Sequence, residues 1–229
     1  PASVARLKNL RKINLSFNFF REVPAILLLL PKIEVLNLQN NELRKLPAGI
    51  HQLLKLKELN LRDNSISELH TSIGKLANLE VLDLRYNQLA ALPAGLGRLK
   101  KLQRLDLSSN KFHQLPSVVG ELTALQRLDL SGNKIDSLPN KLSALQELRN
   151  LDISSNRLPS MPLCVGSMRN LERLDMQYNN RLTTLPDTLR NLQRLERLML
   201  SGNLFERLPD VVFTLKNLKI LALRWCKIT

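Results

Sequence analysis

The residues most able to do chemistry are five aspartates, each 23 positions after the one before it. They are Asp83, Asp106, Asp129, Asp152 and Asp175. Carboxylates held close together can bind a metal ion or take up and release a proton. If each aspartate lies on one of a series of neighbouring strands, the carboxylates are only about 4.8 Å apart. Whether they act together therefore depends on the elements that carry them.

Four arginines suggest a simpler role for these aspartates. They are Arg104, Arg127, Arg173 and Arg197, which recur two residues before the aspartate column. On the same strand face, they would offset the carboxylates in a ladder of exposed ion pairs, each contributing about 0–1 kcal/mol. The three histidines fall at different positions of the pattern, and no glycine-rich phosphate loop or metal-spaced Cys/His set occurs. We therefore expect no enzyme activity, no cofactor and no metal.

A repeated leucine pattern sets the spacing of both charged columns. The pattern Leu-x-x-Leu-x-Leu-x-x-Asn-x-Leu recurs every 23 residues, with one interval of 24 after Leu171. Its first apolar position falls at Leu10, Ile33, Leu56, Leu79, Leu102, Leu125, Leu148, Leu171, Leu195 and Leu218. This period and this pattern are typical of leucine-rich repeats.

Each unit of the pattern predicts its own local structure. Leu105 and Leu107 alternate with polar residues, which indicates a short strand. Asn110 follows in the turn, where its amide can bond backbone groups of adjacent repeats. Val119 and Leu122 have the spacing of a 3₁₀ turn. Because one repeat cannot bury its leucines alone, the sequence predicts an α/β repeat solenoid. Its shape is a horseshoe with a concave parallel β-sheet and short 3₁₀ or irregular convex limbs.

The repeat resembles the intracellular Ras-group class of leucine-rich repeats, whose 23-residue units end as residues 92–102 do here. The resemblance covers Pro1 to Thr229. It implies a signalling scaffold that binds a small GTPase or a phosphatase. Roco kinases belong to the same class, so the alternative is a regulatory or substrate-recognition repeat domain of a larger enzyme. A basic binder of nucleic acid or membrane surfaces is a weaker alternative.

The repeats predict a single domain over residues 1–229, with nine full repeats and partial repeats at both ends. Pro1 aligns with Pro47, so the chain begins midway through a repeat, and it ends at Thr229 inside another. We expect a segment of a longer protein that can self-associate through its uncapped ends. The longest apolar run, residues 25–30, is far shorter than the ~20 residues of a membrane helix. With two cysteines and no secretory signal, we expect a cytoplasmic protein, with the nucleus as the alternative.

Partner-binding residues are expected on the concave face and at the strand exits. The predicted patch holds Arg62, Arg85, Tyr86, Arg104 and Arg127, which fall in consecutive repeats. The strand-exit column also contains Phe17, Tyr178 and Trp225. Tyr, Trp and Arg are common anchors of protein interfaces. The alternative is that these rings pack against neighbouring side chains at the solenoid edge.

A basic flank is the competing surface, because the net charge is +14. Its central members are Lys75, Arg98, Lys100 and Lys101 on the return limbs. The flank lacks the interleaved aromatic residues that stack on bases, so nucleic acid is not the expected partner. It is either a solvated surface or a contact for an acidic protein.

Overall fold

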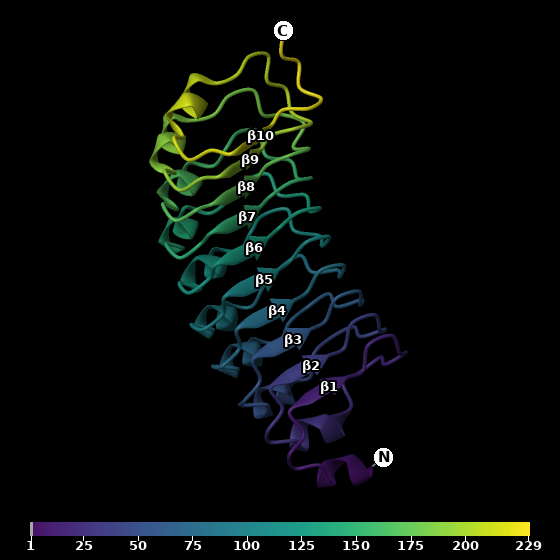
Figure 1. Cartoon of the computed structure of the whole chain (residues 1–229). Helices are drawn as coiled ribbons and strands as arrows, with labels where there is room; N and C mark the ends of the chain where they lie inside the picture. The colour runs from purple at the N-terminus through teal and green to yellow at the C-terminus, as the bar shows by residue number, and fades with distance from the viewer. Residues whose placement is uncertain (1) are drawn as a thin grey trace.

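Ten parallel strands form one sheet in the part of the chain that the computed structural model describes, residues 2–229. The strands follow one another in chain order from the N-terminal to the C-terminal end of the stack (Figure 1). They are β1 (Lys12–Asn14), β2 (Val35–Asn37), β3 (Glu58–Asn60), β4 (Val81–Asp83), β5 (Arg104–Asp106), β6 (Arg127–Asp129), β7 (Asn150–Asp152), β8 (Arg173–Asp175), β9 (Arg197–Met199) and β10 (Ile220–Ala222). The predicted repeat solenoid with a parallel sheet is confirmed. Pro1 lies outside the described residues, and with it the first position of the alignment to Pro47.

Short 3₁₀ helices form the opposite side of the stack, as the spacing of Val119 and Leu122 predicts. They are η1 (Ala2–Arg6), η2 (Ala25–Leu29), η3 (Ala48–Gln52), η4 (Thr71–Lys75), η5 (Ala94–Arg98), η6 (Ser117–Glu121), η7 (Asn140–Ala144), η8 (Leu163–Ser167), η9 (Asp187–Asn191) and η10 (Asp210–Thr214). Within residues 2–229, no helix has the length and apolar character needed to cross a membrane.

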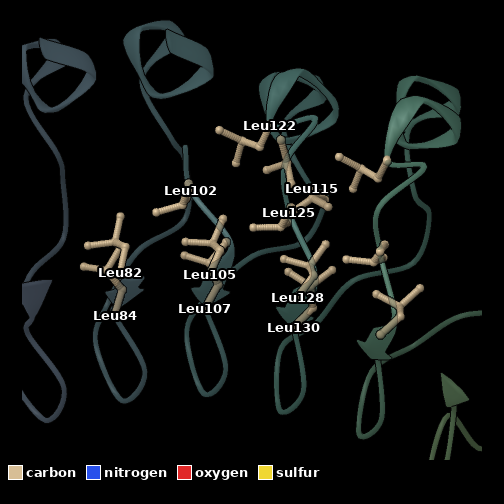
Figure 2. Packing of buried hydrophobic residues seen from close by; sticks show 14 of the residues in the cluster. Leu82, Leu84, Leu102, Leu105, Leu107, Leu115, Leu122, Leu125, Leu128 and Leu130 are labelled. Atoms are coloured by element: carbon tan, nitrogen blue, oxygen red, sulfur yellow. The ribbon is translucent and has the colours of Figure 1, made fainter. Parts of the chain in front are cut away.

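The core fills the space between the strands and the 3₁₀ helices. Leucines from neighbouring repeats stack in this space in rows (Figure 2). Leu105 and Leu107 are buried, whereas Asp106 between them stays partly exposed, which confirms the predicted register. Leu107 lies one residue beyond β5, but its N–H still donates to the carbonyl of Asp129 at 2.8 Å. Strand pairing therefore continues past the regular strand.

A ladder of asparagine side chains joins each turn to the repeat before it. Asn110 Nδ2 donates to the carbonyl of Leu84 in the preceding repeat at 3.0 Å. The same amide donates to the carbonyls of Leu107 and Ser108 in its own turn. Asn110 Oδ1 accepts the N–H of Leu89, again from the preceding repeat, at 2.9 Å. The predicted amide ladder is confirmed, and one side chain satisfies four buried backbone groups.

The one longer repeat interrupts this ladder. Its extra residue lies after Asn179, and Asn180 adopts a left-handed backbone with φ of 60°. The next asparagine of the ladder, Asn203, is 2% exposed, yet its Oδ1 has no hydrogen-bond partner. Asn203 Nδ2 keeps its bond to Met176 O at 3.0 Å. The extra residue forms a bulge in the turn, and one buried acceptor of the next repeat is left unsatisfied.

His70 replaces a proline without changing the path of the chain. Its φ and ψ of −70° and 144° nearly equal the −69° and 147° of Pro47 in the same role. The ring also accepts the N–H of Ser72 at its Nδ1, which caps η4. Histidine in place of proline therefore produces no local bend.

Replacing the ladder asparagine tests its contribution to stability. We expect Asn110→Ala to lower the free energy of unfolding by about 1–3 kcal/mol, because it leaves buried backbone groups unpaired. Asn18→Ala is the control, since Asn18 is exposed and bonds only carbonyls of its own turn. Urea unfolding monitored by circular dichroism measures both. Equal midpoints for Asn110→Ala and the parent would contradict the ladder argument.

Removing the extra residue tests the interruption. We expect deletion of Asn180 to raise the free energy of unfolding by about 1–3 kcal/mol, since it restores the 23-residue spacing and gives Asn203 Oδ1 a donor. Deletion of Lys134, at a regular turn, is the matched control and should destabilise. The same urea titration measures both deletions. A lower midpoint on deletion of Asn180 would show that the bulge itself is required.

Candidate functional site

A groove of about 570 Å³ lies on the exposed face of the strands from β4 to β9. Its walls carry five aspartates and five arginines. They are Asp83, Asp106, Asp129, Asp152, Asp175, Arg85, Arg104, Arg127, Arg173 and Arg197. The groove is therefore balanced in charge, although the whole chain carries a net charge of +14.

The aspartate row is held by the turn that follows each strand. Asp129 Oδ1 accepts the backbone N–H of Ser131 at 2.9 Å and its hydroxyl at 2.7 Å. Asp152 Oδ1 accepts the N–H of Ser154 at 2.9 Å. In β1 to β3 the same position is asparagine, and Asn37 Oδ1 accepts the N–H of Gln39 in the same way at 3.0 Å. This turn therefore needs an acceptor oxygen but no negative charge.

The aspartates lie beside one another in the sheet. Asp106, Asp129, Asp152 and Asp175 are directly paired between successive strands. Partial burial raises the pKa of each of these four carboxyls, and the neighbouring carboxylates raise it further. Ionising these four carboxyls therefore costs more free energy in the folded chain than in water.

The arginine ladder predicted from the sequence is wrong. Arg104, Arg127, Arg173 and Arg197 are exposed and make no ion pair or side-chain hydrogen bond within residues 2–229. Arg85 instead neutralises part of the row, with Nη2 at 2.7 Å from Asp83 Oδ2 and Nε at 3.4 Å from Asp106 Oδ2. The bond to Asp83 raises the pKa of the Arg85 guanidinium. The aspartates are thus contacted by Arg85, two residues after the end of β4, rather than by the arginines at the starts of the strands.

The carboxylate row does not assemble a metal centre. In the described part of the chain, no three His, Cys, Asp or Glu side chains meet in a group that could hold a metal ion. The three histidines are also remote from the groove walls. The arrangement offers charge and hydrogen-bonding groups for recognition.

A second feature runs along the strand exits, where every residue has a positive φ. These residues are Phe17, Asn40, Asp63, Tyr86, Ser109, Gly132, Ser155, Tyr178, Gly202 and Trp225, with φ between 52° and 68°. Asn, Asp and Gly are usual in this conformation, but aromatic residues are not. The aromatic side chains are half or more exposed, except Tyr178 at 40%.

The strand-exit aromatics form three separate contacts rather than one row, and in one of them the guanidinium of Arg224 lies 5.4 Å from the ring centre of Trp225. The guanidinium of Arg62 lies 5.3 Å from the ring centre of Tyr86. At the C-terminal end, the rings of Tyr178 and Trp225 are 5.9 Å apart. They meet across Gly202, where a β-carbon would lie only 2.4 Å from Tyr178 Cδ1. Phe17 is 70% exposed.

The predicted patch is therefore divided between two surfaces. Arg85, Arg104 and Arg127 line the groove, whereas Arg62 and Tyr86 pair at the edge. The groove extends beyond the predicted patch to Arg173 and Arg197 on β8 and β9. Both stand in the same column as Arg104, but the prediction was limited to the consecutive repeats around Tyr86.

The basic flank lies on the 3₁₀ side and is partly tied to neighbouring repeats. Lys75 and Arg98 are exposed at the ends of η4 and η5. Lys100 Nζ donates to the carbonyl of Glu121 at 2.7 Å, and Lys101 Nζ donates to Asn78 Oδ1 at 2.8 Å. Two of the four predicted residues therefore bridge successive repeats.

Family models for leucine-rich repeats match most of this chain. The model "Leucine-rich repeat region" matches residues 48–132 and 95–182, and "Leucine rich repeat" matches residues 8–66. No curated protein matches the sequence.

Solved structures of leucine-rich repeat proteins are similar to it. A leucine-rich repeat protein of Leptospira interrogans is 32% identical with a TM-score of 0.64, covering 99% of this chain and 69% of that one. The octameric complex of Latrophilin 3, Unc5D and the leucine-rich repeat protein FLRT2 matches at 32% identity with a TM-score of 0.86, covering 97% and 70%. The plant peptide hormone receptor RGFR1 in complex with RGF2 matches at 28% with a TM-score of 0.74, covering 99% of this chain and 42% of the receptor. This chain thus spans less than half of that receptor.

Neutralising one aspartate tests the electrostatic state of the row. The pKa of Asp152 is raised above its ordinary value of 3.8 in the folded chain. Between pH 3.8 and the raised pKa of folded Asp152, the folded state binds more protons than the unfolded state, so the free energy of unfolding falls as the pH rises through this range. At pH values above the raised pKa, the folded chain keeps the full penalty of the partly buried charge.

We therefore expect Asp152→Asn to raise the melting temperature at pH 7 and to flatten the change in melting temperature upward from pH 3.8. The amide keeps the acceptor that Ser154 needs, as Asn37 does for Gln39. Asp136→Asn is the control, because Asp136 is exposed outside the groove. Calorimetric scans at several pH values measure both variants. A lower melting temperature for Asp152→Asn at pH 7 would show that the charge stabilises the fold.

Proposed function

This chain belongs to the leucine-rich repeat family, and we propose that it is a non-catalytic scaffold that binds a protein partner on the strand face. The groove carries this proposal. Its exposed arginines have no partner among the described residues, and aromatic side chains stand at its edge in a backbone conformation that aromatic residues rarely adopt. Arginine, tyrosine and tryptophan are the residues that most often anchor protein interfaces.

The similar structures support this proposal through their partners. RGFR1 is seen in complex with RGF2, and FLRT2 is seen in a complex with Latrophilin 3 and Unc5D. Each of these similar proteins is therefore seen bound to another molecule. We carry over to this chain only the general role of binding a protein.

The finer parts of the proposal come from the sequence pattern. The 23-residue units and their Leu-Pro return limbs resemble the Ras-group class, so we propose a small GTPase or a phosphatase in a signalling pathway as the partner. We place the protein in the cytoplasm. Its two cysteines support this compartment, because Cys164 and Cys226 are both unpaired.

A pull-down with paired variants tests the binding face. We expect Tyr86→Ala with Arg104→Ala to weaken capture of the partner by more than about 2 kcal/mol, since anchors dominate interface energies. Both side chains are exposed, so truncating them removes little buried surface from the fold. Lys100→Glu with Lys101→Glu on the basic flank should mainly slow association. Mass spectrometry of the captured proteins identifies the partner and its class.

The two surfaces predict opposite results in this experiment. If the flank binds the partner, capture fails in the Lys100 and Lys101 variant and persists in the Tyr86 and Arg104 variant. That outcome would reject the strand face as the binding surface. Circular dichroism of both variants shows that the fold is retained.

A further inference from the structure

The four arginines without an ion-pair partner lie side by side in two groups of two. Arg104 on β5 is in register with Arg127 on β6, and Arg173 on β8 is in register with Arg197 on β9. Asn150 on β7 separates the two pairs. Like charges on adjacent strands repel each other, and none of these four arginines forms an ion pair within residues 2–229. Each pair can close on one carboxylate, because guanidinium groups bind carboxylates through two parallel hydrogen bonds.

Three carboxylates, Asp129, Asp152 and Asp175, lie on the strands between the midpoints of the two arginine pairs, and Asp175 Oδ2 already accepts a hydrogen bond from Gln177 Nε2 at 2.9 Å. Asp129 on β6 and Asp152 on β7 use only Oδ1 in hydrogen bonds to the protein. Their Oδ2 atoms make no hydrogen bond or ion pair to any described residue. Burial and the neighbouring carboxylates raise the pKa of both groups, so a cation from outside would relieve them.

The charge pattern of the groove selects the kind of occupant. A polyanion such as a nucleic acid would meet the arginines but would also meet five aspartates. A polycation would meet the aspartates but would be repelled by the five arginines. A segment that carries both signs in the right order satisfies both rows, so the groove fits a protein segment of mixed charge.

The spacing of the rows matches an extended segment. The midpoints of the two arginine pairs are three strand intervals apart, which is about 14 Å at about 4.8 Å for each interval. Four residues of extended chain span about 13 Å, and successive side chains point to opposite sides. In a bound segment that runs across the strands, residues at the first and fifth positions therefore face the arginine row, and those at the second and fourth positions face the aspartate row.

We infer that the groove binds an extended segment of the protein partner with two acidic residues four positions apart and basic residues directly inside them. The acidic residues bind the Arg104/Arg127 and Arg173/Arg197 pairs. The basic residue at the second position binds Asp129, and the one at the fourth position, which lies between β7 and β8, binds the free Oδ2 of Asp152. This inference rests on the proposed function, because it specifies what the partner presents to the strand face.

A synthetic peptide tests this arrangement on the 229-residue chain. The probe is a fluorescein-labelled peptide with two glutamates four positions apart, a lysine directly inside each, and glycine and serine elsewhere. The control peptide has the same composition with the glutamates adjacent and the lysines outside them. We expect fluorescence anisotropy to show saturable binding of the probe, at least about tenfold tighter than the control peptide.

Two sets of variants locate the binding. Arg127→Glu with Arg173→Glu changes one arginine of each pair and should weaken probe binding at least about tenfold. Lys100→Glu with Lys101→Glu makes the same change in net charge on the flank and should leave binding unchanged. If the first variant fails to fold, Arg127→Gln with Arg173→Gln replaces it. Asp129→Asn with Asp152→Asn should weaken the probe but not a peptide whose lysines are glutamines.

The contrary outcomes are distinct. Equal affinity for both peptides, or equal loss in the groove and flank variants, would show general electrostatic attraction and overturn the inference. Tighter binding of a single-stranded oligonucleotide than of the probe would overturn it in favour of a polyanion. If the probe fails to bind while Tyr86→Ala with Arg104→Ala still abolishes capture of the partner, the segment is wrong but the proposed function stands.

Discussion

The asparagine amide in each turn is the interaction on which the rest of the structure depends. The turn leaves backbone N–H and C=O groups in the interior, where they require hydrogen-bond partners. Asn110 supplies partners to its own turn and to the preceding repeat at the same time. In the regular repeats, the asparagine side chain bonds the same two positions of the preceding repeat, so these hydrogen bonds keep neighbouring strands in register. Rows of equivalent side chains on the strand face are a direct result, and the groove consists of those rows.

The turn also explains which surface residues are unexpected. The strand exit requires a positive φ in each of the ten described repeats, a conformation that suits Gly, Asn and Asp. Ser109, Gly132 and Ser155 in the middle of the column are small or polar. Tyr86 and Trp225 are neither, and both rings are half or more exposed. The fold gains little from these aromatic residues, so their presence supports a role in contact with another molecule.

The fold was predictable from the sequence because its signals are periodic and local. The leucine spacing sets the strands and the 3₁₀ helices, and the asparagine spacing sets the turns. The ion pairs were not predictable from the same columns. The sequence placed Arg104 two residues before Asp106, which is the right face, but Arg85 reaches Asp106 from the neighbouring strand instead. Several carboxylates lie within reach of a long arginine side chain, and its rotamer and burial decide which one it pairs with. The spacing of residues in the sequence gives no information on either. The interval of 24 residues is visible in the sequence, but the unsatisfied acceptor appears one repeat later at Asn203.

The aspartate row is the clearest sign that the strand face is more than a product of the fold. The turn needs one acceptor oxygen at this position, and Asn14, Asn37 and Asn60 provide it without charge in the first three strands. From β4 to β8 the acceptor becomes a carboxylate, although adjacent carboxylates repel one another and partial burial opposes ionisation. The change does not serve the turn, because the hydrogen bond is the same in both cases. It begins at the strand where the groove begins and runs beside arginines that the protein leaves unpaired. The aspartates destabilise the fold, and they form a row of negative charge beside a row of positive charge along one groove. This pattern is expected of a surface that recognises a partner.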